Sequence, residues 1–186
     1  QLIEPKNNTT GALSQYDAVV LGIRAYNVLD ELKFKQPILM EYVKNGGNII
    51  VQYNTAGRND SRLDNLAPYP LTLSSDRVTD ENSPVKILDP KNSLVNFPNK
   101  ITQKDFEGWV QERGLYFPNT WAKEFTPVFS MEDQGESPKM GSLLIAPYGK
   151  GHYIYTGLSF FRELPAGVPG AYRIFANMLS AGKEKL

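Results

Sequence analysis

The chain has 186 residues, of which 41% are hydrophobic and 22% charged, and its 20 Lys and Arg balance 20 Asp and Glu, which is typical of one globular domain. The absence of a Lys/Arg cluster argues against a nucleic-acid partner, and no apolar run approaches the roughly 20 residues of a membrane span. With no Cys and one His, the sequence excludes disulfides, thiolate nucleophiles and multi-histidine metal sites, and we expect no metal and no cofactor.

The first predicted unit is a strand, a helix and a second strand. Residues 16–23 (YDAVVLGI) have the near-continuous apolar character of a strand buried on both faces of a parallel sheet. Gly46-Gly47 ends the following helix, and residues 48–54 (NIIVQYN) form a second buried strand. The apolar stripe of the helix consists of Phe34, Ile38, Leu39, Tyr42 and Val43. This βαβ pattern predicts that the two strands are parallel neighbours in the sheet core.

A long excursion follows, over about residues 55–125. Up to residue 104 it is rich in Asn, Asp, Ser and Pro, and we expect it to be mostly irregular. Its scattered apolar residues favour an ordered, packed segment over a disordered one. A short helix is predicted at residues 104–112.

The last third of the chain predicts strands and a helix. Strands are expected at residues 126–131, 142–146 and 152–157, and the PYGKG turn at residues 147–151 makes the last two a hairpin. The closing helix has an apolar stripe of Ala171, Ile174, Phe175, Met178 and Leu179, with Gly182 as its cap. No linker divides the chain, so residues 1–186 are predicted to form a single domain.

Several segments resemble the class I glutamine amidotransferase-like fold, especially its ThuA-like branch: YDAVVLGIRAYN, NGGNIIVQYN, LVNFPNKITQKDFEGWVQERGLYF and PYGKGHYIYTGLSFF. The runs DFEGWVQERGLYFP and GLSFFRELPAGVPGAYRIFANMLS are similar to the C-terminal domain of some bacterial PIG-L/LmbE-family deacetylases. The resemblance covers nearly the whole chain. It implies an α/β fold, a flavodoxin-like three-layer sandwich with a mostly parallel sheet, a long irregular insertion and a C-terminal β-hairpin plus helix.

The resemblance also implies that the chain is a fragment of a larger protein. The first strand and helix of the fold would precede Gln1 or be trimmed away, and the catalytic domain of the same polypeptide would be a partner. That catalytic domain would be a metal-dependent de-N-acetylase whose metal ligands are not in this chain. A signal upstream would allow a periplasmic or secreted location.

The residues of glutamine hydrolysis are missing. The resemblance places a nucleophilic Cys on the turn after residues 48–54, and here residues 51–57 read VQYNTAG. The late His-x-Glu pair is also absent, because His152 is the only His. A proton-transfer role for His152 is less favoured than a strand-edge role, because no Ser, Cys or carboxylate adjoins it. We therefore expect no glutaminase activity.

A crevice at the carboxyl ends of the strands is the first candidate site, because ligands of open α/β sheets bind there. Arg, Tyr and amide side chains suit a neutral or anionic polyhydroxylated ligand. The alternative is that these side chains bind loop backbone and cap the neighbouring helix. The candidates are Arg24, Tyr26, Asn27, Gln52, Tyr53 and Asn54, together with Arg162 and Glu163 after the last strand.

An aromatic stretch at residues 106–121 is the second candidate site. It contains both tryptophans, and Trp109, Glu112, Arg113 and Tyr116 could bind a sugar ring. The alternative, which the composition favours, is a hydrophobic cluster that anchors the excursion.

Three carboxylates in and beside this stretch, Asp105, Glu107 and Glu112, also suit a glycosidase, which needs a pair about 5–5.5 or about 6.5–9.5 Å apart. If the segment is helical, Asp105 and Glu112 share a face. The favoured alternative is that Glu112 and Arg113 form surface or structural ion pairs.

The leading hypothesis is a non-catalytic accessory module that contributes carbohydrate contacts, domain docking or both to a PIG-L/LmbE-type N-acetylglucosaminyl deacetylase. The alternative is a carboxylate-dependent hydrolase of a sugar derivative. Two carboxylates facing each other in an open cleft favour the hydrolase, whereas carboxylates paired with Arg or Lys favour the module.

Overall fold

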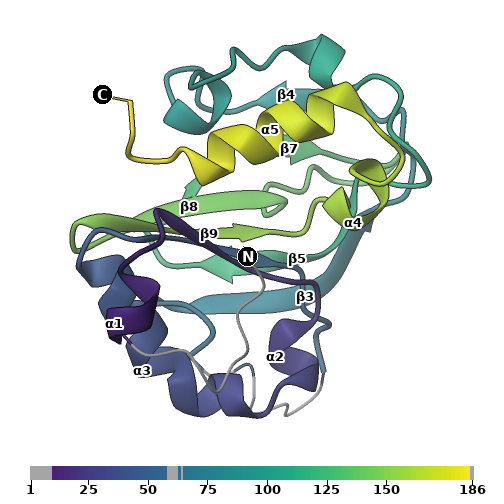
Figure 1. Ribbon diagram of the computed structural model, residues 1–186. Coiled ribbons are helices and arrows are strands. Elements are labelled where there is room, and N and C mark those ends of the chain that lie inside the picture. The colour runs from purple at the N-terminus through teal and green to yellow at the C-terminus, as the bar shows by residue number, and fades with distance from the viewer. Residues whose placement is uncertain (1–9, 58–62, 64, 185–186) are drawn as a thin grey trace.

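A central five-stranded sheet organises the fold (Figure 1). The computed structural model describes residues 10–57, 63 and 65–184, so part of the predicted excursion, residues 58–62 and 64, lies outside the described residues. In spatial order the strands are β1 (Ala18–Leu21), β2 (Asn48–Gln52), β9 (Gly151–Thr156), β8 (Leu143–Tyr148) and β6 (Thr126–Pro127). The first three are parallel to one another, whereas β8 pairs antiparallel with β9, and β6 pairs antiparallel with β8.

The predicted βαβ unit and hairpin are confirmed. β1 pairs in parallel with β2, from Ala18 opposite Asn48 to Leu21 opposite Val51. β8 and β9 form the predicted hairpin, and Gly149 in its turn has φ 60°, a left-handed conformation that favours glycine. Local sequence signals therefore identified the parallel core of the sheet.

β1 lies at the edge of the sheet formed by the described residues. The prediction that residues 16–23 are buried on both faces is wrong, because apolar side chains there reach solvent. Val20 and Ile23 are each 37% exposed. An apolar run predicts a strand of a parallel sheet, but the strand order decides how many neighbours that strand has.

Helices cover both faces of the sheet and complete three layers (Figure 1). Ile49 and Val51 of β2 pack with the residues of α3, whereas Ile50 between them packs with those of α5. This is the flavodoxin-like sandwich that the resemblance implied. The helices are α1 (Thr10–Leu13), α2 (Ala25–Val28), α3 (Glu31–Lys44), α4 (Phe160–Glu163) and α5 (Pro169–Leu179).

The two long helices agree with their predictions except at Phe34 and at Leu179, which is 38% exposed. Leu39 and Val43 of α3 are fully buried, but Phe34 is 78% exposed. Phe34 lies two positions after the buried Leu32, and two positions turn a helix by about 200°, which places Phe34 on the opposite face. Gly182 follows α5 at φ 82°. No helix among the described residues is both long and apolar enough to cross a membrane.

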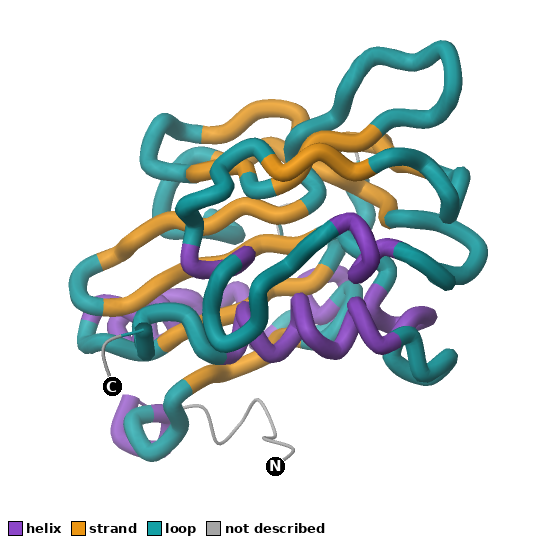
Figure 2. Tube along the Cα trace, turned by 90° about the horizontal axis from the view of Figure 1, so that it is seen from above, coloured by secondary structure: helices purple, strands orange, loops and turns teal. Residues whose placement is uncertain are grey.

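The excursion is mostly irregular, as predicted, but it also contributes strands to two small antiparallel sheets. β3 (Leu71–Val78) pairs with β5 (Gly114–Trp121), and β4 (Val85–Ile87) pairs with β7 (Phe129–Met131). Figure 2 shows these strands beside the main sheet. β3 carries few apolar residues and its pairing is interrupted by bulges, so it lacks the alternation that predicts a strand. The strand predicted at residues 126–131 is split between β6 and β7.

The helix predicted at residues 104–112 is reduced to one 3₁₀ turn, η3 (Gln103–Phe106), and a second such turn, η2 (Ser93–Val95), precedes it. Gly108 at φ 71° and Gln111 at φ 66° are left-handed, which prevents a continuous helix. Asp105 and Glu112 therefore do not share a helix face.

Candidate functional site

Three aromatic rings from separate elements meet near the carboxyl ends of the parallel strands. Tyr53, directly after β2, stacks on Tyr116 of β5 with ring centroids 5.8 Å apart and planes 19° apart. The ring of Phe161 in α4 lies 5.3 Å from that of Tyr53. We call Tyr53, Tyr116 and Phe161 the aromatic triad. Tyr53 is nearly buried, whereas Tyr116 and Phe161 are half-buried and reach solvent.

Arg24 holds the loop after β1 against the triad. Its backbone N–H donates to the carbonyl of Tyr53 at 2.7 Å, and its φ is 56°. The side chain of Arg24 is exposed, and within the described part of the chain its guanidinium has no hydrogen-bond or ion-pair partner. Arg24 and Tyr53 therefore adjoin each other through their backbones, just after neighbouring strands.

A buried carboxylate positions two more arginines beside the triad. Glu112 is 3% exposed, and its two oxygens accept from Arg162 Nε at 3.0 Å and Arg77 Nη2 at 2.7 Å. The Arg162 guanidinium also lies over the Phe161 ring, with Cζ 4.8 Å from the centroid. Burial raises the pKa of Tyr53, and the positive charges of Arg24 and Arg162 oppose that rise.

Left-handed backbone is concentrated around this site. Four described non-glycine residues have positive φ, and three of them, Arg24, Gln111 and Tyr116, belong to the triad or to segments adjoining it. Such conformations cost about 1–3 kcal/mol each and cluster at functional positions.

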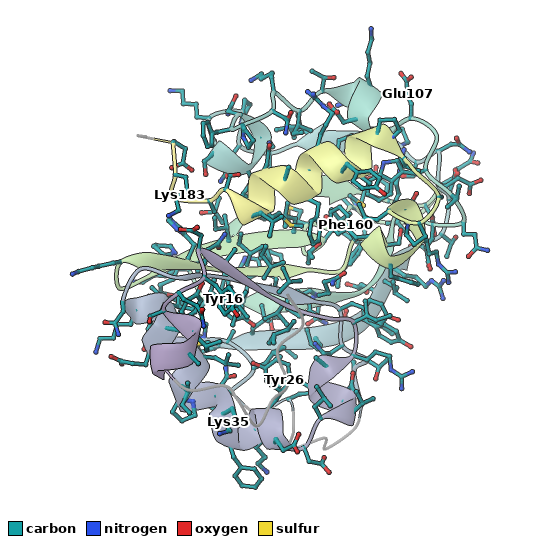
Figure 3. All side chains as sticks on the ribbon, in the orientation of Figure 1. Tyr16, Tyr26, Lys35, Glu107, Phe160 and Lys183 are labelled. Atoms are coloured by element: carbon teal, nitrogen blue, oxygen red, sulfur yellow. The ribbon has the colours of Figure 1, made fainter. Side chains whose placement is uncertain are left out.

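Three of the residues predicted for the crevice, Tyr26, Asn27 and Asn54, instead form hydrogen bonds that stabilise the loops. Tyr26 is buried and its hydroxyl donates to Gln36 Oε1, and burial raises the pKa of Tyr26 well above its usual value. Asn54 Oδ1 accepts from the Tyr26 N–H at 2.9 Å, and Asn27 Oδ1 accepts from the Thr55 N–H at 2.8 Å. Figure 3 places Tyr26 in the helical layer that contains α2 and α3.

Two further candidates are not part of the triad. Gln52 is half-buried at the end of β2. Glu163 is fully buried, and its two oxygens accept from the Val110 N–H at 3.0 Å and the Ser159 hydroxyl at 3.1 Å. Burial raises the pKa of Glu163, although the Val110 and Ser159 bonds oppose the rise. Glu163 therefore ties the loop after η3 to α4.

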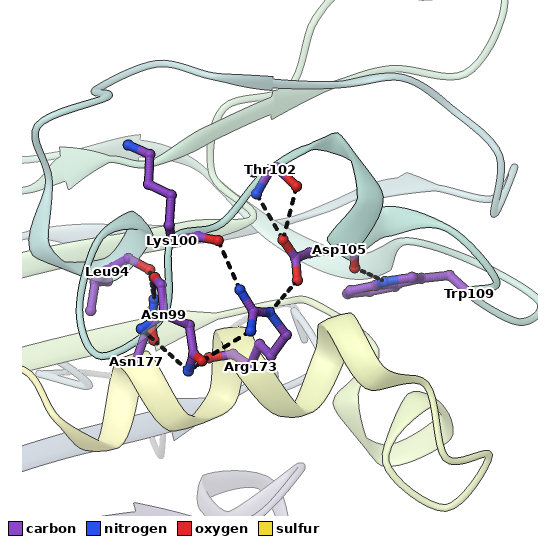
Figure 4. Close-up of polar contacts among 8 residues, drawn as sticks. All are labelled: Leu94, Asn99, Lys100, Thr102, Asp105, Trp109, Arg173 and Asn177. Atoms are coloured by element: carbon purple, nitrogen blue, oxygen red, sulfur yellow. Dashed lines mark hydrogen bonds and ion pairs between the residues drawn. The ribbon is translucent and has the colours of Figure 1, made fainter.

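The aromatic stretch divides between the core and the aromatic triad. Trp109 is 4% exposed, and its Nε1–H donates to the Asp105 carbonyl at 2.9 Å (Figure 4). Its ring packs near Phe106 and Phe160. Trp109 is therefore a packing residue in this structure, whereas Tyr116, seven positions later, stacks on Tyr53.

Arg113 is also a packing residue, buried next to Phe106 and Trp109. Its guanidinium donates to the carbonyls of Ser83 and Phe106 and lies over the Phe106 and Trp109 rings. Burial lowers the pKa of Arg113 to about 10.

The three predicted carboxylates lie in different surroundings. Asp105 Oδ1 accepts from Arg173 Nε at 2.7 Å, and Oδ2 accepts from the Thr102 N–H at 2.7 Å (Figure 4). Glu107 is exposed, and Glu112 binds its two arginines. Asp105 and Glu112 thus belong to separate ion-pair networks.

The turn after β2 differs from a nucleophile turn in conformation as well as in residue type. Nucleophiles on a strand-to-helix elbow sit in strained backbone, but none of residues 51–57 has a positive φ. His152 is the second residue of β9 and lies opposite Asn48 at the amino end of β2, so it is remote from Tyr53 at the other end.

Sequence reasoning missed Phe161 and Arg77. Phe161 directly precedes the predicted Arg162, so the same loop position pointed to it. Arg77 reaches Glu112 only through the pairing of β3 with β5, for which the sequence carries little signal.

Comparison with known proteins identifies the fold. No protein-family model matches the chain, and no curated protein matches its sequence. A cytoplasmic protein from Salmonella typhimurium superposes with TM-score 0.59 and 14% identity, covering 93% of this chain and 74% of its own. A ThuA-like protein from Bacteroides uniformis superposes with TM-score 0.54 and 11% identity, covering 97% and 76%.

A third match is only part of a longer chain. A β-galactosidase from Rahnella sp. R3 superposes with TM-score 0.50 and 14% identity over 91% of this chain and 23% of its own. At these identities the matches report the fold alone, and the chain has a ThuA-like fold.

Proposed function

We propose that this chain is a non-catalytic, carbohydrate-contacting module of a larger PIG-L/LmbE-type N-acetylglucosaminyl deacetylase. The observation that carries the proposal is the stacking of Tyr53 on Tyr116 at the turn where an amidotransferase of this fold holds its thiol. Burial raises the pKa of Tyr53, so the phenol stays neutral at physiological pH. The turn therefore offers an aromatic surface with a hydroxyl in place of a nucleophile.

The triad has the chemistry that sugar recognition needs. Half-buried Tyr116 and Phe161 offer ring faces to the apolar C–H face of a pyranose, while Arg24, Arg162 and the Tyr53 hydroxyl supply hydrogen-bond donors. These groups come from several elements of a packed scaffold, which favours a preformed site.

The pairing of the carboxylates supports the module over the hydrolase. Asp105 binds Arg173, and Glu112 binds Arg77 and Arg162. A glycosidase acid needs a raised pKa, which an adjacent guanidinium opposes. The ion pairs therefore suit a positioning role for both carboxylates.

Domain docking is a second role with its own observation. β1 is an edge strand within the described sheet, and Val20 and Ile23 expose apolar surface there. The match to 23% of the β-galactosidase chain also supports a module that forms part of a larger sugar-processing protein.

Binding to a panel of neutral, amino and acidic oligosaccharides, measured by isothermal titration calorimetry, tests the proposal. We expect at least one member to bind, and Tyr116→Ala to weaken that binding at least tenfold. Tyr148→Ala is the matched control, because this half-buried Tyr ends β8 opposite Gly151, at the amino end of β9. If no member binds, or if both variants weaken binding equally, the proposal is wrong.

A further inference from the structure

We propose that the ligand of this site is an acidic sugar, a pyranose that carries a carboxylate or sulfate group held by Arg24 and Arg162 beside the aromatic triad. The inference rests on the proposed function and specifies the chemical class of its ligand. Its structural basis is a pair of arginines with unused donors near the aromatic triad and a buried carboxylate, Glu112, that is already paired with Arg77 and Arg162.

Arg24 is a strained residue with a free side chain. Arg24 has φ 56°, a left-handed conformation that strains an Arg backbone more than it would strain Gly or Asn. Its guanidinium makes no ion pair or hydrogen bond with any described residue. The loop could keep its backbone bond to the Tyr53 carbonyl with a smaller residue at this position. The strain is therefore better explained by a role for the guanidinium than by a role for the backbone.

Arg162 is held in place while most of its donors stay unused. Its Nε bonds to Glu112, and its guanidinium plane is supported by the Phe161 ring, with Cζ 4.8 Å from the centroid. No hydrogen bond from either Nη of Arg162 to a described residue is found. A guanidinium presents a planar fork that fits a carboxylate or sulfate, and a fixed fork loses little entropy on binding.

The carboxylate at the site does not cancel this positive charge. Glu112 is 3% exposed and shared by Arg77 and Arg162, so two guanidinium groups already bind one carboxylate that hardly reaches solvent. The other nearby carboxylate, Glu163, is fully buried and occupied by Val110 and Ser159. An anionic group would therefore meet net positive charge.

Tyr53 completes the recognition of an anion. The Arg24 N–H bonds to the Tyr53 carbonyl, and Arg162 lies over the Phe161 ring that contacts the Tyr53 ring, so both arginines adjoin Tyr53. The positive charges of Arg24 and Arg162 oppose the rise in the pKa of Tyr53 that burial causes. Because that pKa remains raised, the hydroxyl stays protonated and can donate a hydrogen bond to an oxyanion.

The test compares matched oligosaccharides by calorimetry at low and physiological salt: a glucuronate-containing oligomer, a sulfated oligomer and their neutral counterpart. We expect one or both acidic oligomers to bind at least tenfold tighter than the neutral one, which is about 1.4 kcal/mol. We also expect this preference to shrink as salt rises, because exposed charges are screened. The two acidic arms show whether carboxylate or sulfate is the group recognised.

Two variants separate the arginines from the fold. Arg24→Asn keeps a residue that tolerates the left-handed conformation, so unfolding should be unchanged while the acidic preference falls at least fivefold. Arg162→Lys keeps a charge for Glu112 but removes the planar fork, and should also reduce the preference. Lys183→Gln is the charge-matched control, because Lys183 pairs with exposed Asp17 just before β1, at the amino end of the sheet.

The failures of the two proposals are distinguishable. Equal binding of acidic and neutral oligomers, with loss on Tyr116→Ala, would overturn the acidic-sugar inference and leave the carbohydrate module standing. An acidic preference that survives both arginine variants would also overturn the inference. Absence of binding by every oligomer would remove both proposals.

Discussion

Arg173 of α5 donates through Nε to Asp105 Oδ1 at 2.7 Å and so joins two segments 68 positions apart in the sequence (Figure 4). Asp105 belongs to the short η3 turn, which two further contacts hold in place. The Asp105 carbonyl accepts a hydrogen bond from Trp109 Nε1–H, and the backbone of Asp105 lies against Gly170. The middle of the chain is thereby fastened onto the closing helix. These contacts lead to the first two predictions, which concern stability.

Trp109→Ala should lower the free energy of unfolding by about 3–5 kcal/mol, the usual cost of removing a large buried aromatic side chain. Trp109 is 4% exposed and contacts Phe106 and Phe160. Chemical denaturation of wild type and variant measures the loss. Trp109→Phe keeps most of the ring volume and should cost less. An unchanged unfolding curve combined with lost sugar binding would instead assign Trp109 to a ligand platform.

Gly170→Ala should destabilise the protein by about 1–3 kcal/mol, although Ala favours a helix by about 1 kcal/mol over Gly. A Cβ at position 170 would lie 1.8 Å from the Asp105 carbonyl oxygen, so η3 would have to move away from α5. Gly22→Ala is the control, because no atom lies within 4 Å of a Cβ there. A thermal unfolding series compares them, and a Gly170→Ala protein as stable as wild type would contradict the close packing.

Glu163→Gln should change how stability depends on pH. Burial raises the pKa of Glu163 above its ordinary value of 4.5, so between the two values the folded chain binds more protons than the unfolded chain. Stability from this group is therefore present below pH 4.5 and is lost as the pH rises through the raised pKa. The free energy of unfolding of wild type, measured relative to that of Glu163→Gln, should fall from pH 4 to pH 7, because Gln does not titrate. Denaturation at several pH values measures this difference, and a wild type that gains stability relative to the variant as the pH rises would show the opposite shift.

The purified chain should release no glutamate from glutamine. It has no Cys, and the turn after β2 carries Tyr53 in unstrained backbone. A coupled glutamate assay against a buffer blank measures this. Release above the blank that disappears in Tyr53→Ala would refute the prediction.

Parts of the candidate site could be predicted from the sequence. The strand-end rule placed Arg24, Tyr53 and Arg162 near one crevice because parallel strands end at the same edge of a sheet. The rule could not separate Tyr53, which joins the triad, from Tyr26, which is buried against Gln36. Neighbouring loop residues point in different directions, and the direction depends on packing that sequence position does not report.

The sequence by itself determined the elements whose signals are local: the βαβ unit, the β8–β9 hairpin and α5, which apolar periodicity and turn glycines encode. Only the tertiary structure decided the edge position of β1, the pairing of β3 with β5 and the stacking of Tyr53 on Tyr116. These relationships join residues far apart in the chain. They are selected by how whole layers bury their apolar faces together, and no short window of sequence contains that information.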